Sequence, residues 1–131
     1  MRFNFLCVLL LHNPALLIIC VSGWEREDMV EFEWDENKRQ ATLLERGIDF
    51  IDAVLIWDDP FRQERVDTRK SYGEIRYQTI GRSPLGILFV VYTTRFYTRG
   101  KQINRLISVR PAKKKEVEQY NNHTFSIGLA I

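Results

Sequence analysis

The sequence predicts an α+β fold, in which helices pack on one face of a mainly antiparallel β-sheet. Three observations support this prediction. An alternating strand pattern at residues 30–34 is followed by two helical segments before residue 60. Four strand-like segments then follow one another between residues 61 and 110. A last helical segment covers residues 112–120, so the expected order is β-α-α-β-β-β-β-α.

The first half of this pattern is one strand and two capped helices. Residues 30–34 alternate apolar and acidic side chains, as a half-buried strand does. Asp35 is a good N-cap for a helix over residues 36–46, and Gly47 ends that helix because glycine tolerates a left-handed turn. Asp49 caps a second helix, which an Asp-Asp-Pro triplet stops and whose apolar face collects Phe50, Ala53, Val54 and Trp57.

The second half changes to the two-residue period of strands. Residues 61–66 are a short, charged edge candidate, and residues 75–80 and 87–94 flank a turn as the two strands of a hairpin. Residues 87–94 are nearly all strand formers, so we expect the central strand there, covered on both faces. The last strand is expected at residues 102–110, with Pro111 at the first position of the last helix.

The composition predicts one globular domain between a leader and a tail. The 131 residues are 45% apolar and 27% charged, which argues against a disordered chain, a collagen-like fibre or a coiled coil. Residues 1–28 are an apolar leader with three open interpretations: a mis-called start upstream of Met29, a signal-like or anchoring segment, or packed structure. Residues 29–120 are then the domain proper, and residues 121–131 are expected to be a loose tail.

Few residues are available for metal or nucleophilic chemistry. Both cysteines lie within the first 20 residues and the two histidines stand near the two ends, so we expect no metal site in the body. The body contains no phosphate loop, no Gly-x-Ser-x-Gly motif, no zincin motif and no paired-cysteine motif. Asp58 and Asp59 form a carboxylate pair, which the end of the second helix explains without any chemistry.

The net charge of +2 hides a strong asymmetry. Residues 30–60 carry nine acidic and three basic side chains, whereas residues 61–131 carry fourteen basic and five acidic ones. This favours a polyanionic or acidic partner for the second half, with an unevenly charged solvated surface as the alternative. Cations bind phosphates and aromatic rings stack on bases. The candidates are Arg76 and Tyr77, then Arg95, Phe96, Tyr97 and Arg99, then Arg105, Arg110 and the lysines at 113–115.

An ordered series of short motifs runs through residues 30–120. The motifs are Phe32-Glu33-Trp34-Asp35-Glu36-Asn37-Lys38, Arg46-Gly47-Ile48-Asp49-Phe50, Ala53-Val54, Asp58-Asp59-Pro60, Asp67-Thr68-Arg69, Tyr72-Gly73-Glu74 with Arg76, Ile80-Gly81, Val90-Val91-Tyr92-Thr93, and Ile107-Ser108 with Arg110, Ala112 and Glu116. In order and spacing, this series resembles the BrnT-type ribonuclease toxins of bacterial type II toxin–antitoxin systems. The resemblance implies a compact RelE-like fold.

The resemblance also implies a ribonuclease that needs no metal and no cofactor. The 2′-hydroxyl of the RNA attacks the adjacent phosphate, and preorganised cations stabilise the charge that develops there. On this basis we expect Arg76 and Arg110 to stabilise the phosphate and Glu74 to act as the base. Tyr72 or Tyr92 would stack on a base or relay a proton. The residues expected to bind RNA are Arg95, Arg105, Lys113, Lys114, Tyr72 and Tyr92.

A BrnA-type antitoxin is the partner that the resemblance implies. The toxin would inhibit translation in the cytoplasm without a stable membrane partner, and operator DNA would be bound only through the antitoxin complex. Thr94 stands where the family usually has an acidic residue, and residues 109–113, with Pro111, also depart from the family pattern. These departures keep open a non-catalytic RNA- or protein-binding module, or a decayed toxin, on the same fold. The leader keeps open a secreted or membrane-associated protein.

Overall fold

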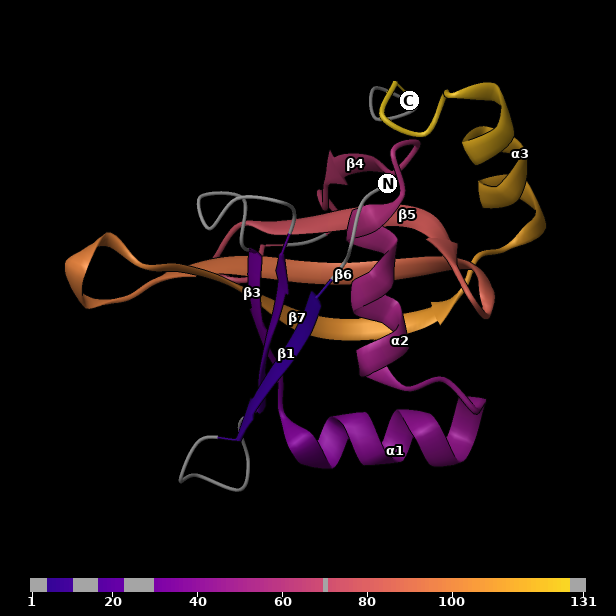
Figure 1. The fold of residues 1–131 in the computed structure, drawn as a ribbon. Coiled ribbons are helices and arrows are strands. Elements are labelled where there is room, and N and C mark those ends of the chain that lie inside the picture. The colour runs from indigo at the N-terminus through magenta and orange to yellow at the C-terminus, as the bar shows by residue number, and fades with distance from the viewer. Residues whose placement is uncertain (1–4, 11–16, 23–29, 70, 128–131) are drawn as a thin grey trace.

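A single β-sheet with helices against both of its faces forms the molecule (Figure 1). The computed structural model describes residues 5–10, 17–22, 30–69 and 71–127. The strands are β1 (Phe5–Leu10), β2 (Leu17–Ser22), β3 (Val30–Glu33), β4 (Gln63–Val66), β5 (Arg76–Ser83), β6 (Gly86–Phe96) and β7 (Gln102–Pro111). The helices are α1 (Glu36–Arg46), α2 (Phe50–Val54) and α3 (Lys114–Asn122), with 3-10 turns η2 (Leu55–Asp58) and η3 (Thr98–Gly100).

The sheet confirms the expected α+β, mainly antiparallel fold. Its strand order is β1-β2-β3-β7-β6-β5-β4. Strand β3 pairs in parallel with β7, and all the other neighbouring strands are antiparallel. From β3 to α3, the elements follow the order that the sequence predicts. Residues 5–10 and 17–22, expected to belong to the leader, extend this sheet as β1 and β2, whereas the alternative start at Met29 lies outside the described residues.

The caps of the first two helices are those that the sequence predicts. The Asp35 carboxylate accepts hydrogen bonds from the backbone N–H groups of Asn37 and Lys38, at 2.9 and 3.4 Å. Gly47 ends α1 with φ 69°, in the left-handed region. The second helical segment is less regular than expected, because α2 ends at Val54 and tightens into the 3-10 turn η2.

Strand β6 is the middle one of the five strands β3, β7, β6, β5 and β4 and is covered on both faces, as predicted. Leu88, Val90 and Tyr92 belong to a core cluster that also contains Phe50 from α2. The intervening Phe89 and Val91 pack instead with Tyr120 of α3 and Phe125. Two separate cores therefore lie on opposite faces of the sheet.

The two cores correct the expectation that all helices pack on one face. Because β6 presents apolar side chains on both faces, each face needs its own cover, and α3 supplies the second one. Pro111 is the last residue of β7 and not the first residue of a helix, since a proline is tolerated at a strand end. The tail also differs from the expectation: α3 continues to Asn122, and Phe125 beyond it is fully buried.

Candidate nucleic-acid interface

One face of the sheet collects arginine side chains from four strands. Directly paired residues share a face, and so do residues two apart along a strand. Arg76 pairs with Thr93, which pairs with Arg105, and this row lies two residues along β6 from Val91, which packs with Phe125. The face therefore carries α3, and we call it the basic face. Its strand arginines are Arg65, Arg76, Arg82, Arg95, Arg105 and Arg110.

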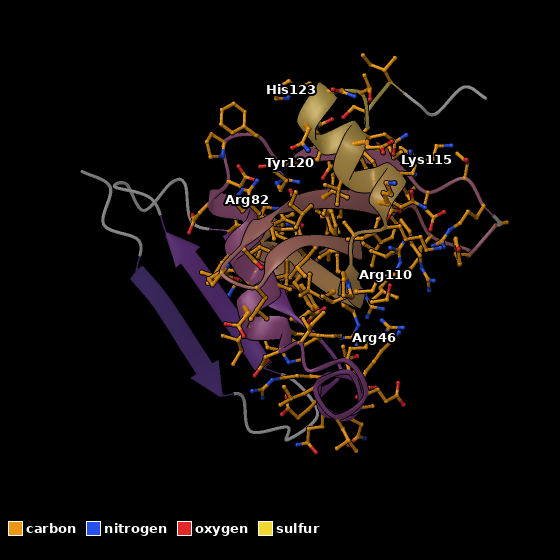
Figure 2. The ribbon with its side chains drawn as sticks, turned by 90° about the vertical axis from the view of Figure 1, so that its right-hand side faces the viewer. Arg46, Arg82, Arg110, Lys115, Tyr120 and His123 are labelled. Atoms are coloured by element: carbon orange, nitrogen blue, oxygen red, sulfur yellow. The ribbon has the colours of Figure 1, made fainter. Side chains whose placement is uncertain are left out.

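The basic face is bordered by α3 and by α1. Figure 2 shows Arg110 on this flank, with Lys115 of α3 above it and Arg46 of α1 below it. Arg46 donates a hydrogen bond to the backbone carbonyl of Val109, at 2.6 Å, and so ties α1 to strand β7. Helix α1 thus borders the basic face and contributes cations to it.

The pKa of Lys38 on α1 is lowered in part by the cations of the basic face. Burial lowers the pKa of its ammonium group, and repulsion from Arg76, Arg46 and Arg105 lowers it further, whereas Asp35 acts in the opposite direction. A lysine whose pKa is lowered by neighbouring cations is typical of a site that is built to receive negative charge.

Three of the predicted site residues meet at the start of β5. The Arg76 guanidinium forms an ion pair with Glu74, at 3.2 Å, and lies 4.0 Å from the centre of the Tyr72 ring. The Tyr72 hydroxyl donates to Asp67, at 3.4 Å. Arg76 is thereby held between a carboxylate and an aromatic ring, which limits its rotamers and preorganises its charge.

Arg110 is held in place by a carboxylate of α3. Its guanidinium donates two hydrogen bonds to Glu116, at 2.7 and 2.9 Å, and lies 3.8 Å from the centre of the Phe89 ring. Glu116 also accepts from the backbone N–H of Lys113, at 2.8 Å. Burial alone would raise the pKa of Glu116, but the hydrogen bond from Arg110 and the Lys113 N–H lower it overall. Arg110 is therefore fixed, with part of its charge already compensated.

Arg105 faces a buried carboxylate on β3. Its guanidinium lies 3.6 Å from Glu33, whose side chain is 2% exposed. The Tyr97 hydroxyl donates to both oxygens of the same carboxylate, at 2.7 and 2.8 Å. Burial, and then the contact with Glu33, raises the pKa of Tyr97. These contacts hold the segment after β6 against β3, at the edge of the basic face.

This arrangement is suited to binding a phosphodiester. Arginines that carboxylates hold in place can stabilise the charge of a phosphate, and the Glu74 carboxylate and the Tyr72 hydroxyl beside Arg76 can move protons. Within the described residues, no group of three or more His, Cys, Asp and Glu side chains is placed to hold a metal ion. No helix in that part of the chain is long and apolar enough to cross a membrane.

Comparison with known proteins identifies the family of this chain. The family model described as the ribonuclease toxin BrnT of type II toxin–antitoxin systems matches residues 34–116. The chain belongs to the BrnT family. It is thus a type II toxin–antitoxin ribonuclease toxin, and the family implies an antitoxin partner. No curated protein matches the chain.

The basic face of this BrnT-family chain brings together most of the residues expected at the site. Glu74, Arg76 and Tyr72 are in direct contact, and Arg105 and Arg110 lie on the same face. The remaining three predicted cations lie at its margins: Arg95 is exposed near the end of β6, Lys113 is the N-cap of α3, and Lys114 begins that helix.

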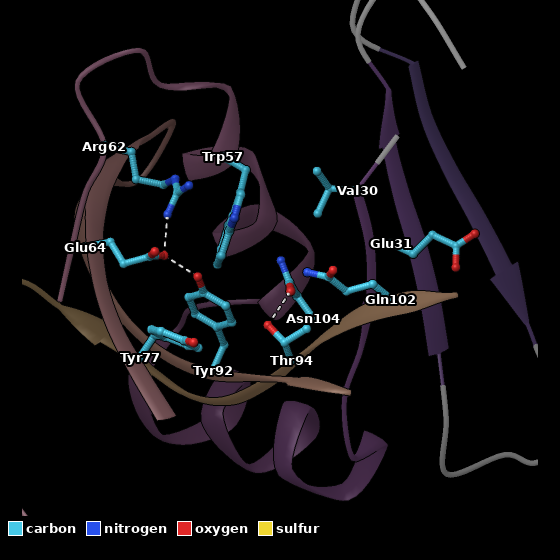
Figure 3. A pocket seen from close by; sticks show the side chains of 10 residues that line it. All are labelled: Val30, Glu31, Trp57, Arg62, Glu64, Tyr77, Tyr92, Thr94, Gln102 and Asn104. Carbon is cyan, nitrogen blue, oxygen red and sulfur yellow. Dashed lines mark hydrogen bonds and ion pairs between the residues drawn. The ribbon is translucent and has the colours of Figure 1, made fainter. Parts of the chain in front are cut away.

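Tyr92 is the one predicted site residue on the other face. Its ring packs against Trp57 and Tyr77, and its hydroxyl donates to Glu64 (Figure 3). Burial raises the pKa of Tyr92, and the hydrogen bond to Glu64 raises it further. The structure thus separates Tyr92 from Arg76 by the thickness of the sheet.

Sequence reasoning missed the contribution of α1 and of the buried carboxylates. Lys38 and Arg46 both belong to the motifs on which the family resemblance rests. Their spacing of eight residues places them near one side of a helix. No sequence pattern indicates that Glu33 faces Arg105 or that Glu116 clamps Arg110, because these pairs join separate elements.

Asp59 has a structural role. Its carboxylate accepts from the Tyr120 hydroxyl at 2.6 Å and from the backbone N–H groups of Arg82 and Phe61 at 2.7 and 2.9 Å. Burial would raise the pKa of Asp59, but these hydrogen bonds lower it overall. Asp59 therefore joins η2, β5 and α3, which agrees with its interpretation as part of a helix stop.

Proposed function

We propose that this chain is a metal-independent endoribonuclease that inhibits translation and is neutralised by a BrnA-type antitoxin. The observation that supports this most is the basic face itself, where the register of four strands places six arginines on one side of the sheet. A surface of this kind attracts the phosphate backbone of RNA.

Cleavage uses the cluster at the start of β5. Arg76 binds the scissile phosphate and stabilises the negative charge that builds up on it, and Glu74 takes the proton from the adjacent 2′-hydroxyl. The 2′-oxygen bonds to phosphorus and the bond to the 5′-oxygen breaks, leaving a 2′,3′-cyclic phosphate. Tyr72 relays a proton to the departing 5′-oxygen, and Arg110 binds a phosphate farther along the face. Because carboxylates are weak bases at neutral pH, turnover is expected to be slow.

The antitoxin covers the basic face. Acidic segments of a BrnA-type protein would pair with the arginines of the sheet and exclude RNA. Binding of operator DNA is then a property of the complex, because the antitoxin supplies the DNA-binding surface.

The test is RNA cleavage by the purified full chain in the presence of a chelator. Replacement of Arg76 by alanine is expected to lower the cleavage rate at least 100-fold, as expected for the loss of one preorganised charge-stabilising group. Arg76→Lys keeps the charge but not the planar fork, and is expected to recover only part of the rate.

Arg82→Ala is the matched control, because it removes one exposed arginine that shares strand β5 and this face with Arg76 but lies on the far side of α3 from Arg110 (Figure 2). Cleavage by Arg76→Ala at the rate of the Arg82→Ala control would rule out the assigned role of Arg76. The non-catalytic module remains the second candidate, because Thr94 replaces the family's usual acidic residue. RNA binding without cleavage by the unmodified chain would favour it.

A further inference from the structure

A pocket lies on the face of the sheet opposite the basic face. It has a volume of about 530 Å³, within the range of small-molecule sites. Its walls come from η2, β4 and the ends of β3, β5, β6 and β7 (Figure 3). The proposed cleavage step uses none of its residues. We call it the aromatic pocket; its lining includes Trp57, Arg62, Tyr77, Tyr92, Gln102 and Asn104.

One side of the aromatic pocket is a set of packed rings. Trp57 meets Tyr92 edge to face with ring centres 5.1 Å apart, and Tyr77 stacks on Tyr92 at 5.3 Å. The Arg62 guanidinium lies 4.9 Å from the centre of the Trp57 ring. Such surfaces bind flat rings by stacking, whichever base is presented.

The facing side carries hydrogen-bonding groups. Figure 3 shows the amide groups of Gln102 and Asn104 next to each other, with Thr94 beside them. The Thr94 hydroxyl donates to Asn104 Oδ1, at 3.2 Å, which leaves the Asn104 amide N–H groups directed elsewhere. Among the described residues, the exposed Gln102 amide has no hydrogen-bond partner. Two amides at such a site can pair with the polar edge of a base.

The charges of the aromatic pocket suit a neutral ligand. Arg62 pairs with Glu64 at 3.0 Å, and Lys101 pairs with Glu31 at 3.0 Å, so each cation near the pocket is matched by a carboxylate. A phosphate would gain little there, whereas a neutral aromatic heterocycle would keep its stacking and its hydrogen bonds.

A smaller hollow shares lining residues with both the aromatic pocket and the proposed cleavage site. It has a volume of about 310 Å³ and shares Tyr77, Thr94 and Gln102 with the aromatic pocket. Its lining also includes Glu74, which pairs with Arg76 on the basic face, and the exposed Phe96. A chain bound at Arg76 can therefore pass around the end of the sheet without crossing the core.

We propose that the aromatic pocket binds a base of the RNA chain next to the nucleotide that is cleaved. This inference rests on the proposed function, because it takes RNA as the substrate. The phosphate backbone lies on the basic face, the strand turns at the smaller hollow, and one unpaired base enters between the rings and the amides. Base preference is then decided at Gln102 and Asn104, on the face that carries no phosphate.

The experiment uses short RNA that cannot be cleaved. The probes are 2′-O-methyl tetranucleotides of A, C, G or U, together with a sugar–phosphate tetramer that has no bases, and the readout is the Kd for the full chain. At least one base-bearing probe is expected to bind about 10-fold more tightly than the abasic one, since each stacked base contributes measurably to binding. Equal binding of all five probes would overturn the proposal.

Variants then locate the base. Gln102→Ala is expected to reduce the preference among the four bases about 3- to 10-fold without changing the Kd of the abasic probe. Tyr77→Leu keeps an apolar side chain but removes a ring, and is expected to weaken all base-bearing probes. Gln40→Ala, an exposed amide on α1, is the matched control and should behave as the unmodified chain does. Thermal unfolding of each variant shows whether it is folded.

The outcomes separate the two proposals. If the unmodified chain cleaves RNA and prefers certain bases, but folded Gln102→Ala and Tyr77→Leu keep that preference, the pocket assignment is wrong and the ribonuclease proposal stands. If the unmodified chain neither binds the probes nor cleaves RNA, both are wrong.

Discussion

At the scale of single residues, the basic face works through paired charges. Arg76, Arg105 and Arg110 each lie against a carboxylate, at 3.2, 3.6 and 2.7 Å. Such pairs hold long side chains in one geometry before a ligand arrives, and this reduces the entropy that binding must overcome. The carboxylate of Glu116 also links the stability of the fold to pH.

Glu116 gives a test of this link. Its pKa is lowered in the folded chain, chiefly by Arg110 against the opposing effect of burial, so it stabilises the fold above its unfolded pKa near 4.3. That stability is lost as the pH falls through the lower, folded pKa. Glu116→Gln is expected to cost roughly 1–3 kcal/mol at pH 7 and much less in acid. Urea unfolding at several pH values measures this, and an equal cost at every pH would contradict the assignment.

At the scale of elements, η2 packs closely against β5 on the face of the sheet that carries the core cluster with Phe50. A Cβ atom on Gly81 would lie 2.8 Å from Cβ of Ile56 and 3.2 Å from its carbonyl oxygen. Neither atom can move on its own, because Cβ and the carbonyl oxygen of Ile56 are fixed to its backbone. Ile56 itself is fully buried in the core cluster that contains Phe50. A glycine in this strand therefore marks a contact between backbones.

Gly81→Ala is expected to lower the free energy of unfolding by roughly 1–3 kcal/mol, since the added methyl group overpacks a site that cannot give way. Thermal or urea unfolding is the measurement. Ala53→Gly, which adds no atoms to the same core cluster, separates overpacking from a general sensitivity of that cluster. A Gly81→Ala variant as stable as the unmodified chain would show that η2 is free to move away from β5.

At the scale of the whole molecule, the uneven charge of the sequence becomes one charged surface and several internal pairs. The acidic first half supplies Glu33 to Arg105 of the basic face and Glu31 to Lys101, whereas Arg76 and Arg110 of that face pair with Glu74 and Glu116 from the second half. The core cluster between α3 and the sheet supports the basic face. In this cluster Phe125 meets Phe89 edge to face, with ring centres 6.3 Å apart.

Phe125→Ala tests the second core. Loss of this fully buried ring is expected to cost about 3–5 kcal/mol, as for other large-to-small changes in a core. Phe61→Ala, which removes an exposed ring, is the matched control and should cost little. If the two variants unfold at the same urea concentration, the chain after α3 does not contribute to the core.

The salt dependence of RNA binding tests the basic face as a whole. Each phosphate contact contributes a slope of about −0.7 to a plot of log K against log salt for single strands. Arg95→Gln removes one exposed cation and is expected to make the slope shallower by about 0.7, without changing base preference. A slope that stays the same would place Arg95 outside the RNA path.

The sequence by itself determined the order of elements from β3 to α3 and the caps of the first two helices, because these depend on neighbours along the chain. The Asp35 and Gly47 caps, the boundaries of α1 and the apolar run of β6 are all local, and the structure confirms them. Glu74 and Arg76 are also neighbours along the chain, two residues apart, and they form an ion pair at the start of β5.

Tertiary structure alone decided which of these residues share a face. Side chains alternate along a strand, so the register between strands places Arg76, Arg105 and Arg110 together and puts Tyr92 on the far side. The burial of Phe125 and the pairing of Arg110 with Glu116 likewise depend on how α3 packs against the sheet. Contacts of this kind join residues distant in sequence, and no local pattern in the chain records them.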